Sequence, residues 1–521
     1  MPARLHPGVY VEEVPSGARS IEGASTSTAI FVGETERGPL EPTLITNRTE
    51  FERLFGGHVR QAQPSSVPAA ATDTLELVYA IDAFFQNGGR SAYILRATED
   101  GMETATRTLG NATVRASSPG AWANDSLSVI FAPSTDGDVK RFRLIIFHQP
   151  IGAPAPRMVE NWDRLSTDKA DENHAPTVLK RSLYVSWAPG APVVRPDALD
   201  VTSVNVSEAD LVALAARTRL AGGVGGLADV PAAQYAKLLR RLDAVTDASL
   251  LVLPGKTGDH VNAGLAYVET RPLRDLFYIV DLPRQTAVDA TAAAQATRTF
   301  FQDKLTAKTD LAAVYWPWVE VPDPVGVGQD PTVFIAPSGH IAGLYARTDA
   351  RRGVWKAPAG VEATLLGVRS LEYKVLDTHQ DDLNPLGINA LRLVPAAGVV
   401  SWGARTMRPG SEWRYVSVRR TAIFLRKSIF EGIQWAVFEP NDEPLWASLR
   451  LNVEAFMELQ FRQGAFAGRS SREAYFVKCD TETTTEADKA AGIVNLWVGF
   501  APLRPAEFVV VKLSQKVNTP S

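Results

Sequence analysis

Strand-like apolar runs alternate with helical periodicity in two separate stretches of the chain, residues 28–98 and 208–320. In the first stretch, Thr28–Gly33 predicts a buried strand, and Thr49–Phe55 predicts a short helix with Thr49 as its cap. Thr74–Asn87 repeats apolar residues at helical spacing before a Gly-Gly stop. In the second stretch, a buried strand-like run at Phe277–Val280 and an aromatic strand-like run at Leu311–Val319 flank an alanine-rich helical segment, Thr286–Lys304. Because such alternation builds a sheet with helices packed on it, the pattern predicts one α/β domain interrupted by an insertion.

The intervening residues 99–207 have a different character. Their short strand-like runs are separated by Pro, Gly and Ser, which is the pattern of an all-β unit. A third unit begins near Val361 and contains two long amphipathic helical patterns, Val416–Trp435 and Pro444–Phe461. At about 150 residues per domain, a chain of 521 residues suggests three to four domains. The expected fold class is therefore α/β plus α+β, in several domains.

The predicted organisation has five parts. In chain order they are an N-terminal arm, a split α/β core domain with a β-rich insertion domain, a C-terminal domain and a C-terminal arm. Their predicted bounds are 1–20 for the first arm, 21–98 plus 208–355 for the core, 99–207 for the insertion, 356–505 for the C-terminal domain and 506–521 for the second arm.

Composition excludes several classes of protein. The single cysteine, Cys479, excludes a disulfide framework and a zinc site built from several cysteines. The net charge of −4 excludes broad coating of nucleic acid, which needs a basic face. No run approaches the roughly 18 apolar residues of a membrane helix, and the N-terminus lacks the apolar core of a secretory signal. Synthesis and folding in a cytoplasm are therefore expected.

The segment Pro254–Gly258 follows a strand-like run and resembles a phosphate-binding loop. That motif needs a glycine five positions before the Gly-Lys pair, and Leu250 stands there instead. The match therefore fails, and the segment is expected to be a surface turn with an exposed Lys256. A nucleotide hydrolase that uses Lys256 is kept as the competing hypothesis.

Other tempting motifs have ordinary explanations. The cluster Gly222–Gly226 lacks the dinucleotide-binding spacing and is expected to be a hinge or tight turn. Ser338 stands near His340 without the glycines of a nucleophile elbow. His379–Asp382 is better explained as a polar loop than as a cation site, and Cys479 as a buried small hydrophobe. No catalytic, cofactor-binding or metal-binding residue is assigned, so the protein is not expected to be an enzyme.

Both chain ends carry an isolated strand-like pattern. The residues concerned are Val9, Tyr10 and Val11 near the start and Phe508, Val509, Val510, Val511 and Leu513 near the end. Each end either pairs within its own domain or adds a strand to a neighbouring copy. A compact chain of this length is about 60 Å across, and twenty extended residues span up to about 66 Å. Either end is therefore long enough to reach another subunit.

The helical pattern that starts at Pro444 has two contrasting stripes. Asn441 or Asp442 is its expected N-cap, and Gly464 lies beyond its end. The apolar stripe consists of Leu445, Leu449, Val453, Phe456 and Met457, and the charged stripe consists of Arg450, Glu454, Glu458 and Arg462. At intervals of four, the charged residues form either a solvated face of paired charges or a docking face for a partner.

A set of short motifs, in this order along the chain, resembles the contractile tail sheath proteins of phages and of phage-tail-like contractile injection systems. The motifs are Pro7–Glu13, Thr28–Gly33, Arg37–Pro39, Ala313–Trp318, Pro337–Gly343, Tyr345–Asp349, Arg352–Ala359, Leu383–Asn389, Trp402–Thr406, Val437–Asn441 and Gly464–Gly468. The resemblance spans residues 7–98 and 210–515. The insertion matches no motif, which fits a variable outer domain in this family.

The resemblance implies a structural subunit of a contractile sheath, which polymerises helically around an inner tube and contracts to drive the tube through a target envelope. It implies arms that pair with neighbouring copies, an insertion that faces outward, and a C-terminal domain that contacts the tube through Arg450, Glu454, Glu458 and Arg462. The implied partners are copies of the same chain in sixfold stacked rings, an inner tube protein, and baseplate and terminal cap proteins. No nucleic acid, membrane insertion or cofactor is implied.

The resemblance also bears on location and on alternatives. It implies assembly in the bacterial cytoplasm without a signal peptide, in a phage tail or a phage-tail-like particle that can be released from the cell. A non-contractile tube or baseplate component is a further alternative, which the Trp402–Thr406 motif and the two arms disfavour.

Overall fold

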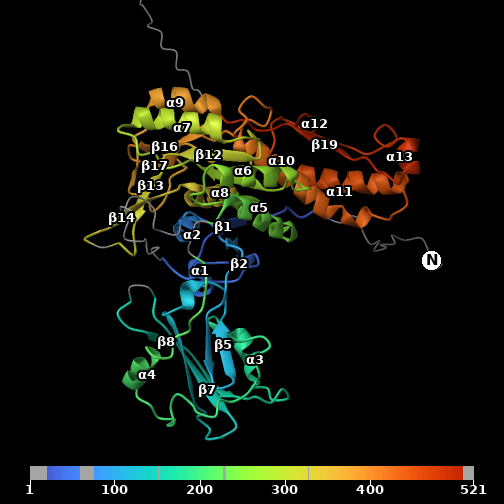
Figure 1. The fold of residues 1–521 in the computed structure, drawn as a ribbon. Helices are drawn as coiled ribbons and strands as arrows, with labels where there is room; N and C mark the ends of the chain where they lie inside the picture. Colours follow the sequence, from blue (N-terminus) through green and yellow to red (C-terminus); the bar gives the residue numbers. More distant parts are fainter. Residues whose placement is uncertain (1–19, 59–75, 151–152, 227–229, 327, 508–521) are drawn as a thin grey trace, which may run out of the picture. The chain divides into compact units, whose positions relative to one another are not determined.

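The computed structural model describes residues 20–58, 76–150, 153–226, 230–326 and 328–507 (Figure 1). These residues form two compact units. The α/β unit comprises residues 26–351 and 358–416, and the helical unit comprises the described residues of 1–25, 352–357 and 417–521. The predicted arm residues Val9, Tyr10, Val11 and Phe508–Leu513 lie outside the described residues. Both units combine helices with sheets, which confirms the predicted α/β plus α+β multidomain fold class.

An eight-stranded sheet forms the centre of the α/β unit. In spatial order its strands are β17 (Gly398–Ser401), β16 (Ile388–Val394), β12 (Ala312–Trp316), β11 (Phe277–Asp281), β10 (Leu250–Val252), β1 (Ala29–Gly33), β3 (Ala92–Arg96) and β2 (Thr43–Ile45). The strands from β16 to β3 are parallel, and the two edge strands are antiparallel to their neighbours. Because β1 pairs directly with β10, the stretches on both sides of the insertion build one sheet.

Helices connect and cover these strands, as expected of a mostly parallel sheet. They are α1 (Arg48–Phe55), α2 (Glu76–Gln86), α5 (Ala232–Leu239), α6 (Asp259–Thr270), α7 (Ala290–Lys304), α8 (Ser338–Arg352) and α9 (Asp377–Leu383), with 3-10 turns η3 (Arg240–Ala244) and η4 (Asn384–Leu386). Every residue of β1, β11 and β12 is buried. The uninterrupted apolar runs of these strands therefore form the core between two helical layers.

Helix α8 packs unusually close to α2, and glycine is the reason. A Cβ added at Gly339 would lie 2.4 Å from the carbonyl oxygen of Ala80, and one at Gly343 would lie 2.6 Å from that of Phe84. A side chain at either position would therefore push the two helices apart. The close packing gives a structural role to the glycines of the Pro337–Gly343 motif.

Three details of the predicted elements are wrong. The segment His379–Asp382, expected to be a polar loop, lies in helix α9. Thr49 does not cap the first helix; Asn47 does, because its side chain accepts the Glu50 amide at 2.8 Å. The expected single strand over Leu311–Val319 is two strands in different sheets, because Pro317 lacks the amide that a continuous ladder needs. The second of them, β13 (Val319–Pro322), pairs with β14 (Thr332–Ile335) and β15 (Ser370–Leu371).

The insertion contains two three-stranded antiparallel sheets. One consists of β4 (Thr106–Leu109), β5 (Ala112–Ala116) and β9 (Val185–Trp187), and the other of β6 (Leu127–Pro133), β7 (Phe142–His148) and β8 (Arg157–Leu165). Both sheets contribute to one apolar core, beside the short helical segments η1 (Ala121–Ala123), α3 (Ala175–Val178) and η2 (Leu179–Arg181). A separate core of this size explains why the segment folds as a β unit inside an α/β chain.

The observed packing differs from the predicted domain bounds at two places. Helix α4 (Glu208–Ala215) lies beyond the predicted end of the insertion, yet its Leu211 and Ala215 pack against β6 and β7. Residues 358–416 belong to the α/β unit, whereas the predicted boundary stood at residue 356, because β16 pairs with β12. The predicted roles of the domains remain predictions.

The helical unit is built on a pair of long helices, α10 (Val416–Gly432) and α11 (Glu443–Arg462), joined through the 3-10 turn η5 (Gln434–Ala436). Of the two expected N-caps of the second helix, Asn441 and Asp442, the structure shows Asp442, whose side chain accepts the Leu445 amide at 3.3 Å, and Pro444 lies in the first turn as predicted. The rest of the unit consists of α12 (Ser471–Ala474), β18 (Tyr475–Lys478), α13 (Glu486–Ala490) and β19 (Trp497–Phe500). Val453, Phe456 and Met457 of the predicted apolar stripe lie in its core.

Candidate functional site

The sheet has one position where an α/β fold would normally bind a ligand. Strand β1 has β3 on one side and β10 on the other, so the strand order reverses between β1 and β10. In open α/β sheets, ligands bind outside the carboxyl ends of the strands at such a switch point. Glu34 follows β1, and the loop Pro254–Gly258 follows β10. The loop that fails the phosphate-binding motif therefore lies at the position where an α/β sheet would bind a ligand.

The crevice at this switch point is filled by the protein's own charges. Lys256 Nζ lies 2.9 Å from Glu34 Oε1, and the two side chains are only 14% and 10% exposed. Glu34 also accepts the Val230 amide at 3.3 Å and the Tyr235 hydroxyl at 3.1 Å. The expectation of an exposed Lys256 is therefore wrong: the lysine is held in a largely buried ion pair at the switch point.

Two buried carboxylates lie next to this ion pair, on either side of Gly255. Asp281, at the end of β11, accepts the Gly255 amide at 3.0 Å and both the amide and the hydroxyl of Ser338, at 3.0 and 2.5 Å. Glu76 accepts the Ala336 amide at 3.4 Å, and its Oε1 has no partner among the described residues. Burial raises the pKa of Glu76 to about 8 and that of Asp281 to about 6.

The chemistry available at the switch point is structural. Ser338 donates to Asp281, and no hydrogen bond joins it to His340 in the part of the chain that the structure describes. Burial lowers the pKa of His340 to about 4, so the imidazole is neutral at physiological pH. A serine that is already committed to a carboxylate and a histidine sealed in the core do not form a nucleophile and its base.

Replacing Lys256 by alanine is expected to cost roughly 3 kcal/mol of unfolding free energy, because it leaves the Glu34 carboxylate buried without its cation. The matched double variant Lys256→Met/Glu34→Gln removes both charges and is expected to recover most of that loss. Urea denaturation measures the three free energies, and an ATPase assay on the same samples is expected to show no hydrolysis. Wild-type hydrolysis that disappears in Lys256→Ala would instead support the nucleotide hydrolase.

The described ranges contain neither a metal-binding cluster nor a membrane-spanning helix. No group of three or more His, Cys, Asp or Glu side chains there is arranged to hold a metal ion. No helix in the same residues is both long and apolar enough to cross a membrane. His379, one of the weighed cation ligands, instead lies within hydrogen-bonding distance of Thr291, with 3.2 Å between its Nε2 and the hydroxyl oxygen.

The charged stripe of α11 is used largely within the helical unit. Arg450 Nη2 lies 2.8 Å from Glu443, and its Nη1 donates to the carbonyl of Cys479, which is buried as predicted. Glu458 accepts from Arg462 Nε at 2.9 Å and from the Tyr475 hydroxyl at 3.0 Å. These bonds, led by that from Arg462, lower the pKa of Glu458. Arg450 and Glu458 therefore tie β18 to the helix.

The hairpin of β18 and β19 is a site that the sequence analysis did not assemble. Tyr475 pairs with Phe500 and Lys478 with Trp497, and one face of this two-stranded sheet packs on the core of the helical unit. The other face exposes Phe476 and Trp497, which are 57% and 55% accessible. A two-stranded hairpin is marginal alone. Within the described residues no third strand pairs with it, and such edges are templates for further strands. The sequence shows a short strand pattern at each of the two positions, but it does not show that the two strands pair with each other across some twenty residues.

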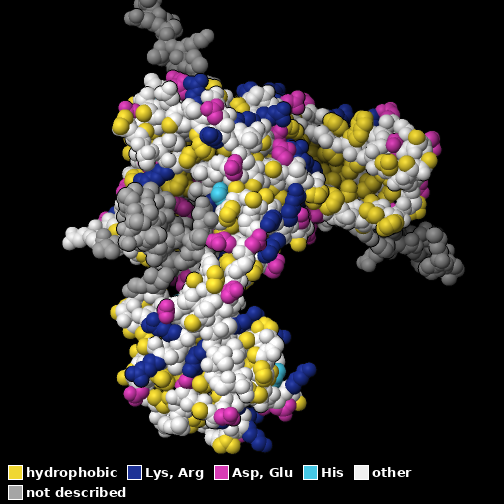
Figure 2. Space-filling view, viewed as in Figure 1, with side chains coloured by type: hydrophobic (Ala, Val, Ile, Leu, Met, Phe, Trp, Pro, Cys, Tyr) yellow, Lys and Arg dark blue, Asp and Glu magenta, His cyan; other side chains and the backbone are white. Residues whose placement is uncertain are grey.

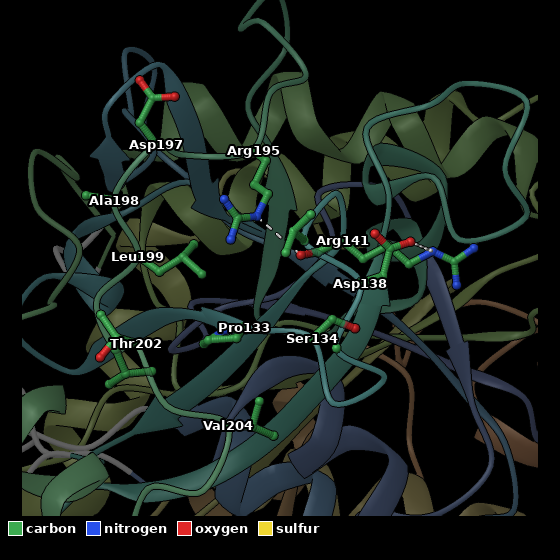
Figure 3. A pocket seen from close by; sticks show the side chains of 13 residues that line it. Pro133, Ser134, Asp138, Arg141, Arg195, Asp197, Ala198, Leu199, Thr202 and Val204 are labelled. Carbon is green, nitrogen blue, oxygen red and sulfur yellow. Dashed lines mark hydrogen bonds and ion pairs between the residues drawn. The ribbon is translucent and has the colours of Figure 1, made fainter.

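The insertion contains a cavity of about 420 Å³ beside the end of β6 (Figure 3). Arg141 on its wall is neutralised by three aspartates, at distances of 3.0 to 3.8 Å: Asp136, Asp138 and Asp171. Arg195 donates to the backbone carbonyls of Arg141 and Pro196 at 3.3 and 3.4 Å. The arginines that line the cavity are therefore bound to their own loops, and the lining residues do not form an acid–base pair.

Sequence comparison identifies two matching domain families. The phage tail sheath protein central domain matches residues 232–407, and the phage tail sheath C-terminal domain matches residues 408–516, together more than half of the chain. The tail sheath protein of Vibrio phage KVP40 is 32% identical over 122 residues, which are 23% of this chain and 18% of that protein. A putative prophage major tail sheath protein of Pseudomonas aeruginosa is 27% identical over 172 residues, 33% of this chain and 43% of that protein. The matches thus span less than half the length of these curated relatives.

Solved structures resemble the chain over almost its whole length. The sheath complex of the extracellular contractile injection system PVC, in its contracted state, superposes with a TM-score of 0.60 and 22% identity over 99% of both chains. The helical sheath of the anti-feeding prophage (AFP), also contracted, gives a TM-score of 0.57 and 24% identity over 99% of this chain and 100% of that one. At these identities the likeness establishes the fold. Together with the two domain matches, it means that the chain belongs to the phage tail sheath protein family.

Proposed function

We propose that this protein is the structural subunit of a contractile sheath, which polymerises helically around an inner tube and contracts to drive the tube through a target envelope. The observation that carries the proposal is the likeness over 99% of both chains to a sheath complex in its contracted state. The largely buried ion pair of Lys256 and Glu34 at the switch point also supports the proposal. These two side chains occupy the position where an α/β fold would bind a ligand, as expected of a protein that acts by assembly.

The β18–β19 hairpin is the proposed acceptor for the arms of neighbouring copies. An arm strand that adds to an open edge contributes main-chain hydrogen bonds, and alternate side chains give specificity. The exposed aromatic rings of Phe476 and Trp497 provide an apolar surface next to those edges. Arm residues Val9, Tyr10, Val11 and Phe508–Leu513 have the alternating or β-branched pattern that such pairing requires. The resulting ladders keep subunits connected while their folded units move.

Contraction needs no nucleotide in this proposal. The sheath assembles in an extended state, held by tube and baseplate contacts, and a trigger lets the subunits repack as rigid bodies. If repacking buries an extra ~200 Å² of apolar surface per subunit, it releases about 5 kcal/mol for each. Summed over many subunits, that free energy is ample for mechanical work.

The remaining assignments follow from the same proposal. The partners are copies of this chain in sixfold stacked rings, an inner tube protein, and baseplate and terminal cap proteins, without nucleic acid or membrane insertion. The C-terminal part faces the tube, and Glu454 and Arg462, the two members of the predicted stripe that project from α11, are the best placed for that contact. The insertion faces outward. Assembly takes place in the bacterial cytoplasm, and the finished particle can be released.

The experiment that tests assembly uses the full chain purified with and without a co-expressed inner tube protein. Electron microscopy and sedimentation are expected to show long regular polymers of even diameter, longer when the tube protein is present. A chain that stays monodisperse at all concentrations, with or without the tube protein, would contradict the proposal. A chain that forms only short discs would favour the baseplate component, the alternative left open by the sequence.

A further inference from the structure

The end of the helical unit at the start of α11 is strongly acidic. Two segments meet there, because Asn441 Nδ2 donates to the Ile493 carbonyl at 3.1 Å and Lys489 Nζ lies 4.8 Å from the centre of the Trp446 ring. This acidic end has eight carboxylates and three cations: Glu431, Glu439, Asp442, Glu443, Asp480, Glu482, Glu486 and Asp488, with Arg450, Lys478 and Lys489. Figure 2 shows acidic side chains around the part of the unit that carries α13.

The acidic end also contains a fully exposed aromatic side chain, that of Phe438, next to Glu439 in the chain. Phe438 is 102% exposed, and its backbone has a φ of +71°, in the left-handed region that bulky residues avoid. Val437 and Phe430 beside it are exposed as well. Strained residues are retained where they serve recognition, and a cluster of exposed apolar side chains rimmed by charge is typical of an interaction surface.

The opposite end of α11 is rich in arginines. The helix has 20 residues and is therefore about 30 Å long. The last turn of the helix carries the exposed Leu459 and Arg462. Beyond it lie three exposed arginines, an exposed leucine and two exposed carboxylates: Arg469, Arg472, Arg504, Leu503, Glu473 and Glu507. The Ala467 amide donates to the Ala501 carbonyl at 2.9 Å, which brings the segments of Arg469 and Arg504 together. Arg469, Arg472 and Arg504 have no ion-pair partner among the described residues, whereas Arg462 pairs with Glu458.

The acidic end and the arginine-rich end are complementary to each other, and the acidic end is not complementary to a second copy of itself. Two acidic ends brought together would repel, so a symmetric contact through this surface is disfavoured. An acidic end on an arginine-rich end pairs opposite charges, lets a guanidinium stack on Phe438, and covers the leucines. A contact between different surfaces of two copies propagates, and it forms rings if it closes and helical filaments if it does not.

We propose that copies of this protein dock head to tail through the helical unit, with the Phe438 end of one copy on the arginine–leucine end of the next. This contact rests on the proposed function, because it presumes that the chain assembles with itself. It is separate from the arms, since all of the residues that form it lie in the described part of the chain. It gives the folded units a specific orientation, which strand exchange by long extended arms does not provide.

The test is a charge-swap experiment on the full chain with both arms intact. The acidic-end variant Glu431→Arg/Glu439→Arg and the basic-end variant Arg469→Glu/Arg472→Glu are each expected to raise the critical concentration for polymerisation at least tenfold. The combination of all four substitutions restores opposite charges and is expected to return it to within about threefold of wild type. Phe438→Ala is expected to raise it at least tenfold as well. A reversal of two exposed acids in the insertion, Glu172→Arg/Asp197→Arg, is the matched control and is expected to change little.

The outcomes separate this contact from the proposed function. Thermal melting of each variant monomer shows that the fold is retained, and sedimentation measures the critical concentration. Wild-type polymers that ignore all of the reversals would overturn the contact and leave the sheath assignment standing. Reversals that block assembly without rescue in the combined variant would overturn the pairing of the two ends. A wild-type chain that never polymerises would overturn the sheath assignment, and the contact with it.

Discussion

A chain that lacks residues 1–14 or residues 507–521 will fold normally and will fail to form regular sheath polymers. The described core residues of both units are all retained in these deletions. Each deletion removes one strand that we propose to pair with a neighbouring hairpin, and the ladder hydrogen bonds of that strand are lost in every subunit at once. The expected change in the melting temperature of the monomer is below about 4 °C, the shift of roughly 1 kcal/mol in a chain of several domains.

Electron microscopy of purified samples at matched concentration measures this effect. The matched control keeps the length of the arm and removes only its pairing: Val509→Pro/Val511→Pro deletes two amides from the C-terminal strand and is expected to behave like the deletion. Val510→Thr keeps every backbone donor and is expected to assemble. Long regular tubes from the truncated chains would contradict the assignment of the ends as intersubunit arms.

Raising the pH from 5 to above 8 is expected to lower the unfolding free energy of the α/β unit. Glu76→Gln is expected to abolish most of that loss. Burial raises the pKa of Glu76 to about 8, while an unfolded glutamate titrates near 4.3. The native state therefore holds a proton that the unfolded state has released, so stability falls as pH rises from about 4 to 8. Over the full window the loss is on the order of 5 kcal/mol. The neighbouring charge of Asp281 raises the pKa of Glu76 further, whereas the charges of Lys256 and Arg284 lower it.

Urea denaturation between pH 5 and pH 9.5 checks this dependence. At pH 9.5 the Glu76→Gln chain should be the more stable of the two, whereas at pH 5 the two should be similar, because wild-type Glu76 is neutral there. Glu172→Gln, at an exposed position, is the control and should follow the wild-type curve. Parallel curves for wild type and Glu76→Gln would show that Glu76 is ionised in the native state at neutral pH, and would contradict the burial argument.

Sequence reasoning captured the elements whose signals are local. The start of α11 was predicted because an acidic cap and an early proline act over four residues. The buried strands β1 and β11 were predicted because a run of four consecutive apolar residues in each leaves little alternative. Helix α8 was not predicted, because it is buried nearly all round and its Gly339 and Gly343 suit close packing rather than helix propensity.

The parts that sequence reasoning missed depend on long-range contacts. Lys256 looked like an exposed loop residue because its partner, Glu34, stands more than two hundred residues away in the chain. The β18–β19 hairpin escaped for a similar reason, since short strand patterns carry no information about their partners. For the α11 stripe, the spacing of four correctly indicated the Glu458–Arg462 pair, but not the bonds of Arg450 and Glu458 to residues at the two ends of β18.

The most direct test of the sheath assignment is helical reconstruction, by electron cryomicroscopy, of polymers of the full chain before and after a contraction trigger such as mild urea. The account predicts two states with the same α/β and helical units inside each subunit, in which the contracted state has a shorter rise per ring and a larger diameter. It also predicts that both arms pair with the β18–β19 hairpins of neighbouring copies in both states. A polymer with a single, invariant set of helical parameters, or one without exchanged strands, would contradict it.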